Sequence, residues 1–442
     1  MSRTNKAVCF CGVMAAGLAA LAPALPAAAA NAEVDGAYPK AYALYVDLHQ
    51  HPELSGSETQ TAAKLAAQLR GLGYTVTEHV GGTGVVALLR NGPGPTIMLR
   101  TELDALPVEE KTGLAFASKV HTKDAAGHEV PVGHMCGHDL HMSALVATAG
   151  IMARSRSEWH GTLMLIGQPA EETIGGASAM VRDGLFKRFP RPDVALALHV
   201  GNELPAGKVG VVPGIYDTNA DSLRITIYGK GGHGSAPHTT VDPVVTAART
   251  ILALQTITSR EVKPGEMAVV TVGYVIAGTK NNIIPDQAEL GLTVRTYKAE
   301  VRKQVLAAIT RITNAEAQAA GTPRPPAIER YEATDAVYND PALAQQLRAV
   351  LETALGKDNV LTMQPLTASE DFSKFVAEGI RGFYLSLGGA DPQKYAAART
   401  TGAQLPSNHS SLFAPDVEPS LRTAIAAEVA LLRGLLKSNA AS

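Results

Sequence analysis

Gly161-Thr-Leu-Met-Leu-Ile-Gly-Gln-Pro-Ala-Glu-Glu172 is the stretch that decides the fold. Its first seven residues form a short apolar run that Pro169 ends, which is typical of a buried strand. Glu171 and Glu172 therefore stand at the mouth of that strand, where two carboxylates are costly unless a cation lies nearby. Adjacent side chains of an extended segment point in opposite directions. One carboxylate could bind a metal ion while the other faces a water molecule, as metal-assisted hydrolysis requires.

Strands and helices alternate on both sides of this stretch, which favours an α/β sheet. Strands are predicted at residues 74–80, 83–90, 95–101, 161–167, 193–200 and 382–387. Helices are predicted at residues 57–72, 142–153, 341–355 and 418–436. The first of these helices has a capping-box pattern at its start and glycines at its end.

The pattern changes between residues 215 and 328, where the predicted order is β-α-β-β-α-β. The elements are expected at residues 223–228, 243–257, 268–276, 288–297, 301–320 and 327–331. This order is the split unit of a small open-faced sandwich, and segments rich in Gly and Pro stand at both of its ends. We therefore predict an inserted domain at 215–328 within a catalytic α/β domain formed by 31–214 and 329–442.

The first thirty residues have the pattern of a signal peptide. Arg3 and Lys6 form a positive start, Ala7–Leu25 is apolar, and Ala28-Ala-Ala30 offers a cleavage site. A retained membrane anchor fits less well, because prolines interrupt the run. Cys9 and Cys11 lie in the apolar run without a lipoprotein pattern, so lipidation is not expected. Removal of the segment leaves only Cys136 and so no internal disulfide. The expected location is the periplasm or the exterior, with no membrane contact after cleavage.

The composition excludes several classes of protein. The chain has 442 residues, of which 46% are hydrophobic and 18% charged, so two domains and little disorder are expected. The formal net charge is -2 and no Lys/Arg cluster is present, which argues against a nucleic-acid partner.

Four polar clusters follow predicted strands. They are centred on Glu102, on the pair Glu171-Glu172, on His199 and on His409. Ligands of open α/β sheets bind outside the carboxyl ends of the strands, so these clusters are expected to converge. Taken alone, His199 is more typical of a buried core histidine.

The segment His134-Met-Cys-Gly-His-Asp-Leu-His141 adds a thiol and several imidazoles. Cys136 and His138 together suit zinc, manganese or cobalt ions. The alternative is a helix N-terminus with a buried free cysteine. His141 lies one helical turn beyond His138 and could bind a metal or orient a ligand.

The inserted domain carries a Gly-rich loop around His233 and His238, without the spacing of a phosphate loop. These histidines are either exposed turn residues or part of a lid over the site. Asn282 lies in a similar loop. Arg295 ends an apolar strand, where it could grip a carboxylate or form a structural salt bridge.

Taken together, the motifs resemble the M20 metallopeptidases, within them the amidohydrolase branch of hippurate hydrolases, auxin-conjugate hydrolases and N-acyl-amino-acid amidohydrolases. The matching pieces are Leu48-His-Gln-His-Pro-Glu-Leu54, Asp104-Ala-Leu-Pro107, Cys136-Gly-His-Asp139, Gln168-Pro-Ala-Glu-Glu172, Gly231-Gly-His233, Pro237-His238, Asn282-Ile-Ile-Pro285 and Ser369-Glu-Asp-Phe372. They run in family order over residues 40 to 440.

The resemblance implies a site for two divalent metal ions, zinc, manganese or cobalt. It implies Cys136 as the bridging ligand, and the other ligands would be His138, Glu172, His199 and His409. Glu171 would be the general base. His233 would reach the oxyanion, Asn282 and Arg295 would hold the substrate carboxylate, and Asp104 would orient a ligand. The inserted domain would serve as lid and dimerisation domain of a homodimer.

The implied reaction is metal-dependent hydrolysis of the amide bond of N-acyl-amino acids or other amino-acid conjugates. A dipeptidase or carboxypeptidase could use the same site. The family usually carries Asp where this chain has Glu102, so Glu102 stands outside the ligand set and could tune the metal preference. That departure is the only support for a non-catalytic binding protein.

Overall fold

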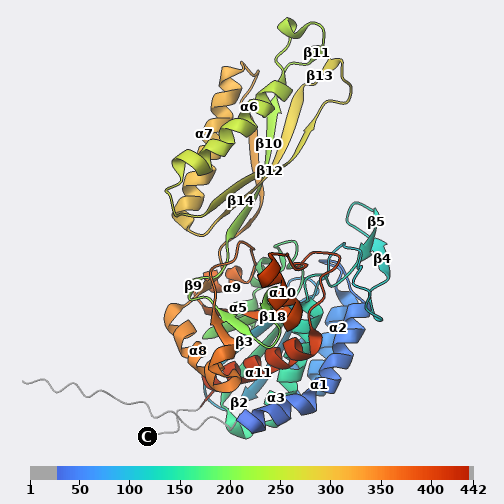
Figure 1. The fold of residues 1–442 in the computed structure, drawn as a ribbon, viewed down its shortest axis with the longest axis vertical. Helices are drawn as coiled ribbons and strands as arrows, with labels where there is room; N and C mark the ends of the chain where they lie inside the picture. The colour runs from blue at the N-terminus through green and yellow to red at the C-terminus, as the bar shows by residue number, and fades with distance from the viewer. Residues whose placement is uncertain (1–26, 438–442) are drawn as a thin grey trace, which may run out of the picture.

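The computed structural model describes residues 27–437 and divides them into a broad lower part and a narrow upper part (Figure 1). Most of the predicted signal peptide, residues 1–26, lies outside the described residues. No helix of the described part is long and apolar enough to cross a membrane. The lower part is the catalytic domain predicted from the sequence, and the upper part is the insert.

The catalytic domain is built on an eight-stranded mixed sheet with the order β1-β2-β6-β3-β7-β18-β8-β17. Its strands are β1 (Thr75–Thr77), β2 (Val85–Asn91), β3 (Thr96–Glu102), β6 (Gly161–Gln168), β7 (Val194–Pro205), β8 (Val209–Val211), β17 (Val360–Thr362) and β18 (Arg381–Ala390). The central strands β6, β3, β7 and β18 are parallel to one another, so their carboxyl ends share one edge. Two smaller pairs flank the sheet, β4 (Val120–Lys123) with β5 (Glu129–Val132) and β9 (Gly214–Ile215) with β16 (Tyr338–Asn339).

Helices cover both faces of this sheet, which explains why its central strands are continuous apolar runs. All eight residues of β6 are buried. One face carries α1 (Ala27–Gln50), α2 (Thr59–Gly71), α3 (His138–Arg154), α8 (Pro341–Leu355) and α11 (Val417–Leu435) over the larger core cluster. The other face carries α4 (Gly176–Arg182), α5 (Leu185–Arg188) and α9 (Ser373–Ala377). Helix α10 (Pro392–Thr401) has no buried residue.

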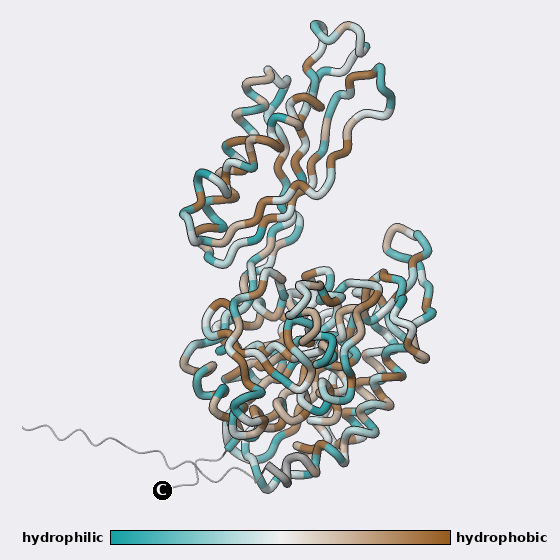
Figure 2. The backbone as a smooth tube through the Cα atoms, viewed as in Figure 1, coloured by the Kyte–Doolittle hydropathy of each residue, from teal (hydrophilic) through white to brown (hydrophobic). Residues whose placement is uncertain are grey.

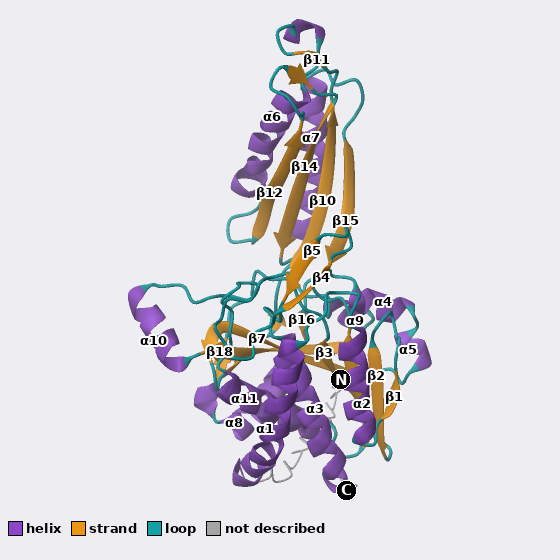
Figure 3. Ribbon diagram, turned by 90° about the vertical axis from the view of Figure 1, so that its right-hand side faces the viewer, coloured by secondary structure: helices purple, strands orange, loops and turns teal. Residues whose placement is uncertain are grey.

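The inserted domain has the predicted β-α-β-β-α-β order. It runs through β10 (Asn219–Tyr228), α6 (Pro243–Thr256), β12 (Ala268–Ala277), β14 (Gln287–Thr296), α7 (Ala299–Ala319) and β15 (Ala327–Thr334). The sheet order is β12-β14-β10-β15, and Figure 3 shows both helices on one face of it. A short pair, β11 (Gly232–His233) with β13 (Ile283–Ile284), forms the far tip. The hydropathy colouring of Figure 2 shows apolar residues along α6, α7 and the strands of the insert, and these residues form its core.

Three features differ from the sequence expectations. Helix α1 was not predicted, although Val34, Ala37, Ala41 and Tyr45 form a buried stripe at helical spacing. Helix α3 begins at His138, four residues before the predicted start, because its first turn carries functional polar residues instead of apolar ones.

The second predicted domain boundary, at residue 328, falls within strand β15. That strand pairs with β10 as far as the partners Ala220 and Thr334. Residues 329–334 therefore lie in the sheet of the insert. The sequence prediction stopped short because this edge strand is largely exposed and carries charged side chains.

Candidate active site

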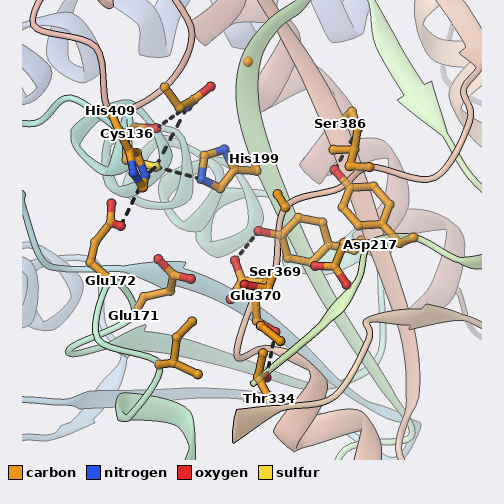
Figure 4. A pocket seen from close by; sticks show the side chains of 18 of the residues that line it. Cys136, Glu171, Glu172, His199, Asp217, Thr334, Ser369, Glu370, Ser386 and His409 are labelled. Atoms are coloured by element: carbon orange, nitrogen blue, oxygen red, sulfur yellow. Dashed lines mark hydrogen bonds and ion pairs between the residues drawn. The ribbon is translucent and has the colours of Figure 1, made fainter. Parts of the chain in front are cut away.

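Three of the four polar clusters predicted from the sequence, those of Glu171-Glu172, His199 and His409, meet in one pocket at the carboxyl edge of the large sheet (Figure 4). Glu171 and Glu172 lie in the turn after β6, and His199 lies within β7. His138 is the first residue of α3, and His409 lies in the loop between α10 and α11. Segments far apart in the chain thus supply one site.

Five side chains form a compact set of metal-ligand type. The Sγ of Cys136 lies 3.3 Å from Nε2 of His199 and 3.3 Å from Nε2 of His409. The Nε2 of His409 lies 3.3 Å from Oε2 of Glu172. The Nε2 of His138 lies 3.8 Å from Oε1 of Glu172. Cys136 belongs to two overlapping groups, one with His138 and His199 and one with Glu172 and His409, and Glu172 forms a further group with His138 and Glu171.

Hydrogen bonds orient these ligand atoms from behind. The Nδ1 of His138 is 2.8 Å from the carbonyl oxygen of Asp104, and the Nδ1 of His199 is 2.9 Å from that of Val200. Each ring therefore presents Nε2 to the site. The Asn408 amide donates to the carbonyl oxygens of Cys136 and Val200 at 3.0 and 2.9 Å. These contacts preform the arrangement of the donors.

The donor set fits two divalent cations. Among the described residues, the buried Nε2 of His138 and Oε1 of Glu172 have no hydrogen-bond partner. Buried polar atoms without partners are costly, and a cation would satisfy both. Burial, together with Glu172 and Glu171, raises the pKa of the Cys136 thiol well above its ordinary value. A thiolate therefore requires added positive charge at this place.

Glu171 lies next to the five-residue set and also forms a possible ligand group with His138 and Glu172. Its carboxylate is buried, lies 3.8 Å from Nε2 of His138 and lines the cavity. Burial, followed by the charges of Glu370 and Glu172, raises the pKa of Glu171 well above its ordinary value. A carboxylate with a raised pKa suits a general base.

Asp104, for which the resemblance implies an orienting role, contacts two of the candidate ligand residues. Besides the backbone contact with His138, its Oδ2 accepts hydrogen bonds from Ser55 Oγ at 2.7 Å and from the backbone N–H of Glu172 at 2.9 Å. Asp104 thus contacts two ligand residues, His138 through its carbonyl oxygen and Glu172 through its carboxylate.

Glu102 and His141 lie behind the site and do not join the described ligand groups. Nδ1 of His141 is 2.9 Å from Oε2 of Glu102, and its Nε2 accepts the N–H of Val200 at 2.9 Å. Both ring nitrogens are occupied, so His141 orients its neighbours and is not a ligand. Burial disfavours an ionised Glu102, but Arg100 and His141 outweigh it and hold its pKa well below the ordinary range.

A buried polar network beneath Glu171 was missed from the sequence. Arg100 pairs with Glu102, with Glu370 at 2.7 Å and with Asp371 at 3.2 Å, and its Nε donates to Gln168 at 2.9 Å. The motif Ser369-Glu-Asp-Phe372 signalled that these residues matter. Their link to Arg100 could not be seen, because the two segments are 270 residues apart.

Three backbone positions near the ligands adopt positive φ angles. They are Gly137 at 91°, Ala170 at 47° and His409 at 70°. Positive φ is uncommon for residues with a Cβ atom and tends to occur at functional sites. Ala170 precedes the pair Glu171-Glu172, and His409 is itself a candidate ligand. Local backbone strain therefore accompanies the site geometry.

Of the three site residues predicted in the insert, only Arg295 lies at the cavity. Arg295 lines the cavity beside the metal-ligand set, and its Nη1 donates to Ser369 Oγ at 2.6 Å. His233 and Asn282 lie together at the far tip, where the N–H of Gly234 donates to the carbonyl oxygen of Asn282 at 2.8 Å. Neither of them lines the cavity of this chain.

The cavity extends from the ligand set to the base of the insert and has a volume of about 430 Å³. A volume in this range suits a small-molecule ligand. Its far wall includes Tyr216, Asp217, Arg295 and Ser386, none of which except Arg295 was singled out from the sequence.

Comparison with known proteins supports the same assignment. Residues 98–400 match the sequence profile of Peptidase family M20/M25/M40. Hippurate hydrolase of Campylobacter jejuni is 37% identical over 333 residues, which cover 74% of this chain and 82% of that protein. Thermostable carboxypeptidase 1 of Saccharolobus solfataricus is 34% identical over 377 residues, or 84% of this chain and 88% of that protein. A dinuclear metal-binding peptidase of the M20 family from Bacillus subtilis superposes with a TM-score of 0.71 at 28% identity, covering 90% and 98% of the two chains.

Proposed function

The chain belongs to peptidase family M20/M25/M40, and on that premise we propose that it hydrolyses the amide bond of N-acyl-amino acids or other amino-acid conjugates. The products are a free amino acid and a carboxylic acid. The observation that carries this proposal is the ligand set around Cys136 with Glu171 beside it.

The residues of the chain divide the work. Cys136, His138, Glu172, His199 and His409 would hold two divalent ions. When bound, such ions supply Lewis-acid activation of the attacking water and of the amide carbonyl. Glu171 takes a proton from that water and returns it to the leaving nitrogen.

Arg295 gives the substrate its orientation. Its guanidinium faces the cavity that contains the ligand set, and a bidentate contact with the α-carboxylate would place the scissile amide near Glu171. The amino-acid part of the substrate then lies toward the insert, and the acyl part lies toward the opening.

Carboxypeptidase activity is the second candidate, because the Saccharolobus relative carries that name. Both reactions free an amino acid with a carboxylate, so Arg295 serves either of them. They differ in whether the substrate's other end is an acyl group or a peptide with a free amine.

The test is amino-acid release from N-acyl-amino acids, N-blocked peptides and free dipeptides. The protein is stripped of metal and reloaded with zinc, manganese or cobalt, since the thiolate favours zinc while the carboxylate and imidazole ligands also accept the other two. Metal-dependent cleavage of the N-acyl-amino acids supports the proposal. Cleavage of peptides alone moves the function to a peptidase, and release with no metal at all contradicts the assigned chemistry.

We also propose that the working form is a homodimer that acts after export to the periplasm or exterior. The insert leaves Val275 and Ile276 of strand β12 exposed, and Leu252 of α6 is 72% exposed. An apolar edge of this kind suits pairing with a second copy. In such a dimer, His233 and Asn282 could reach the partner's cavity, where the sequence motifs give them roles in oxyanion and carboxylate binding.

A further inference from the structure

We propose that Asp217 determines substrate specificity by binding a positively charged side chain on the amino-acid part of the substrate. The inference rests on the proposed function, because Arg295 must first hold the α-carboxylate. It adds a substrate class: conjugates of basic amino acids.

The carboxylate of Asp217 is buried but only half satisfied. Its side chain is 1% exposed, and Oδ1 accepts the N–H of Val337 at 2.6 Å. Its Oδ2 has no hydrogen-bond partner among the described residues. Asp217 lines the cavity, and Figure 4 shows it on the wall opposite Glu172 and His409. A buried carboxylate oxygen without a partner is costly unless a ligand satisfies it.

Asp221, four residues further along the chain, is a nearby buried carboxylate that does have a cationic partner. It is also fully buried, yet Arg302 donates to both of its oxygens at 2.8 Å. Burial raises the pKa of Asp217 well above its ordinary value, and the N–H of Val337 and the charge of Arg295 only partly oppose this. Asp217 thus lacks the hydrogen-bonded cation that Asp221 has, and a cation bound at Oδ2 would be needed to favour its ionised form.

The charge of the cavity wall favours a cation at this place. Away from the ligand set and Glu370, the lining residues include the carboxylates of Glu203, Asp217 and Glu332 and one guanidinium, that of Arg295. Arg295 donates a hydrogen bond to Ser369 through Nη1. The remaining N–H groups of its guanidinium are available to the substrate carboxylate. The wall thereby offers one positive and one negative anchor for a single amino acid.

A purely structural role requires only half of this carboxylate. The contact between Oδ1 and Val337 joins the two chain segments that lead into and out of the insert. An amide side chain can accept the same hydrogen bond through its oxygen. Asp217→Asn therefore keeps the structural contact and removes the charge.

The experiment compares N-acetyl-L-arginine with N-acetyl-L-citrulline, which has nearly the same shape without the charge. The metal-loaded wild type is expected to show a kcat/KM at least about tenfold higher for the arginine conjugate, the scale of a charge-assisted hydrogen bond. Asp217→Asn should bring the ratio close to one and leave the citrulline value within about threefold. Asp335→Asn, which removes an exposed charge from the same linker, should keep the wild-type ratio.

Each other outcome overturns the inference in a distinguishable way. Equal rates for the two conjugates in the wild type remove the charged subsite but leave the proposed function intact. An equal loss on both substrates in Asp217→Asn assigns the residue a structural role. Faster cleavage of free dipeptides than of either conjugate would move the proposed function to a dipeptidase and remove the class of conjugates from the inference. If no N-acyl-amino acid is cleaved with any metal, the proposed function itself fails.

Discussion

At the scale of single residues, two neighbouring glutamates in one turn have different surroundings. The Glu172 carboxylate contacts His409, and the backbone N–H of Glu172 donates a hydrogen bond to the Asp104 carboxylate. Glu171 faces the cavity above the network around Glu370. The sequence predicted this separation from the alternation of an extended segment, but residues 171–174 form a turn, and that turn separates the two side chains.

Replacing Glu171 by Gln should lower kcat by roughly 10³-fold, because a general base contributes on that scale. The metal content, measured by elemental analysis, should stay at the wild-type value. Glu172→Gln serves as the matched control, since it should lose metal as well as activity. Near-normal turnover in Glu171→Gln would remove this residue from the base role.

Cys136→Ser should reduce the metal content more than it reduces the folded fraction. A hydroxyl is a poorer ligand than a thiolate for soft or borderline ions, whereas the change in side-chain volume is small. Metal affinity is measured by competition with a chelator, and folding by circular dichroism. An unchanged affinity would show that the thiol is not a ligand.

At the scale of elements, a buried histidine joins helix α1 to helix α3. His49 lies near the end of α1, with Nδ1 2.7 Å from Asp139 on α3 and Nε2 3.1 Å from Glu110. Burial opposes a charged imidazole, but the hydrogen bonds with Asp139 and Glu110 outweigh it and raise the pKa of His49 to about 10. The charge of His49 thereby stabilises the packing behind the site.

This arrangement predicts how stability depends on pH. Because the pKa of His49 is raised on folding, its contribution is complete below its ordinary value of about 6.5 and is lost as the pH rises through about 10. The free energy of unfolding of the metal-free protein, measured with denaturant, should therefore fall between these limits. His49→Gln should show a smaller fall, and equal slopes in the two proteins would contradict the role of His49.

The clusters at the strand ends could be predicted because sheet topology alone brings them together. The order of elements in the insert followed from the sequence pattern, whereas the ligand set and the role of Glu171 were implied by the resemblance to the M20 family. Asp217 and Arg100 could not be assigned, because their roles depend on packing across distant segments. Glu102 is an example. The sequence showed an unusual residue type at this position, but only the structure shows that its carboxylate contacts Arg100 and His141.

At the scale of the whole molecule, the insert is an elongated unit (Figure 3), and its edge strand β12 carries the exposed apolar residues Val275 and Ile276. If that edge forms the dimer, Ile276→Lys should shift the protein from dimer to monomer in light scattering coupled to size exclusion. A Lys on an edge strand repels pairing with another strand. Lys303→Glu on α7 is a control for a charge change elsewhere on the insert. A dimer that persists in Ile276→Lys would locate the interface on another surface.

The two chain segments that connect the domains run side by side, with Ala220 opposite Thr334 in neighbouring strands. This has a consequence for folding. Strand β18 can pair with β7 only after the long intervening chain has been brought together, and that chain contains the entire insert. An insert that folds first shortens this loop by roughly two-thirds and lowers the entropic cost of closing it by about 1 kcal/mol. Early folding of the insert would thus favour pairing of β7 with β18 in the lower sheet during synthesis.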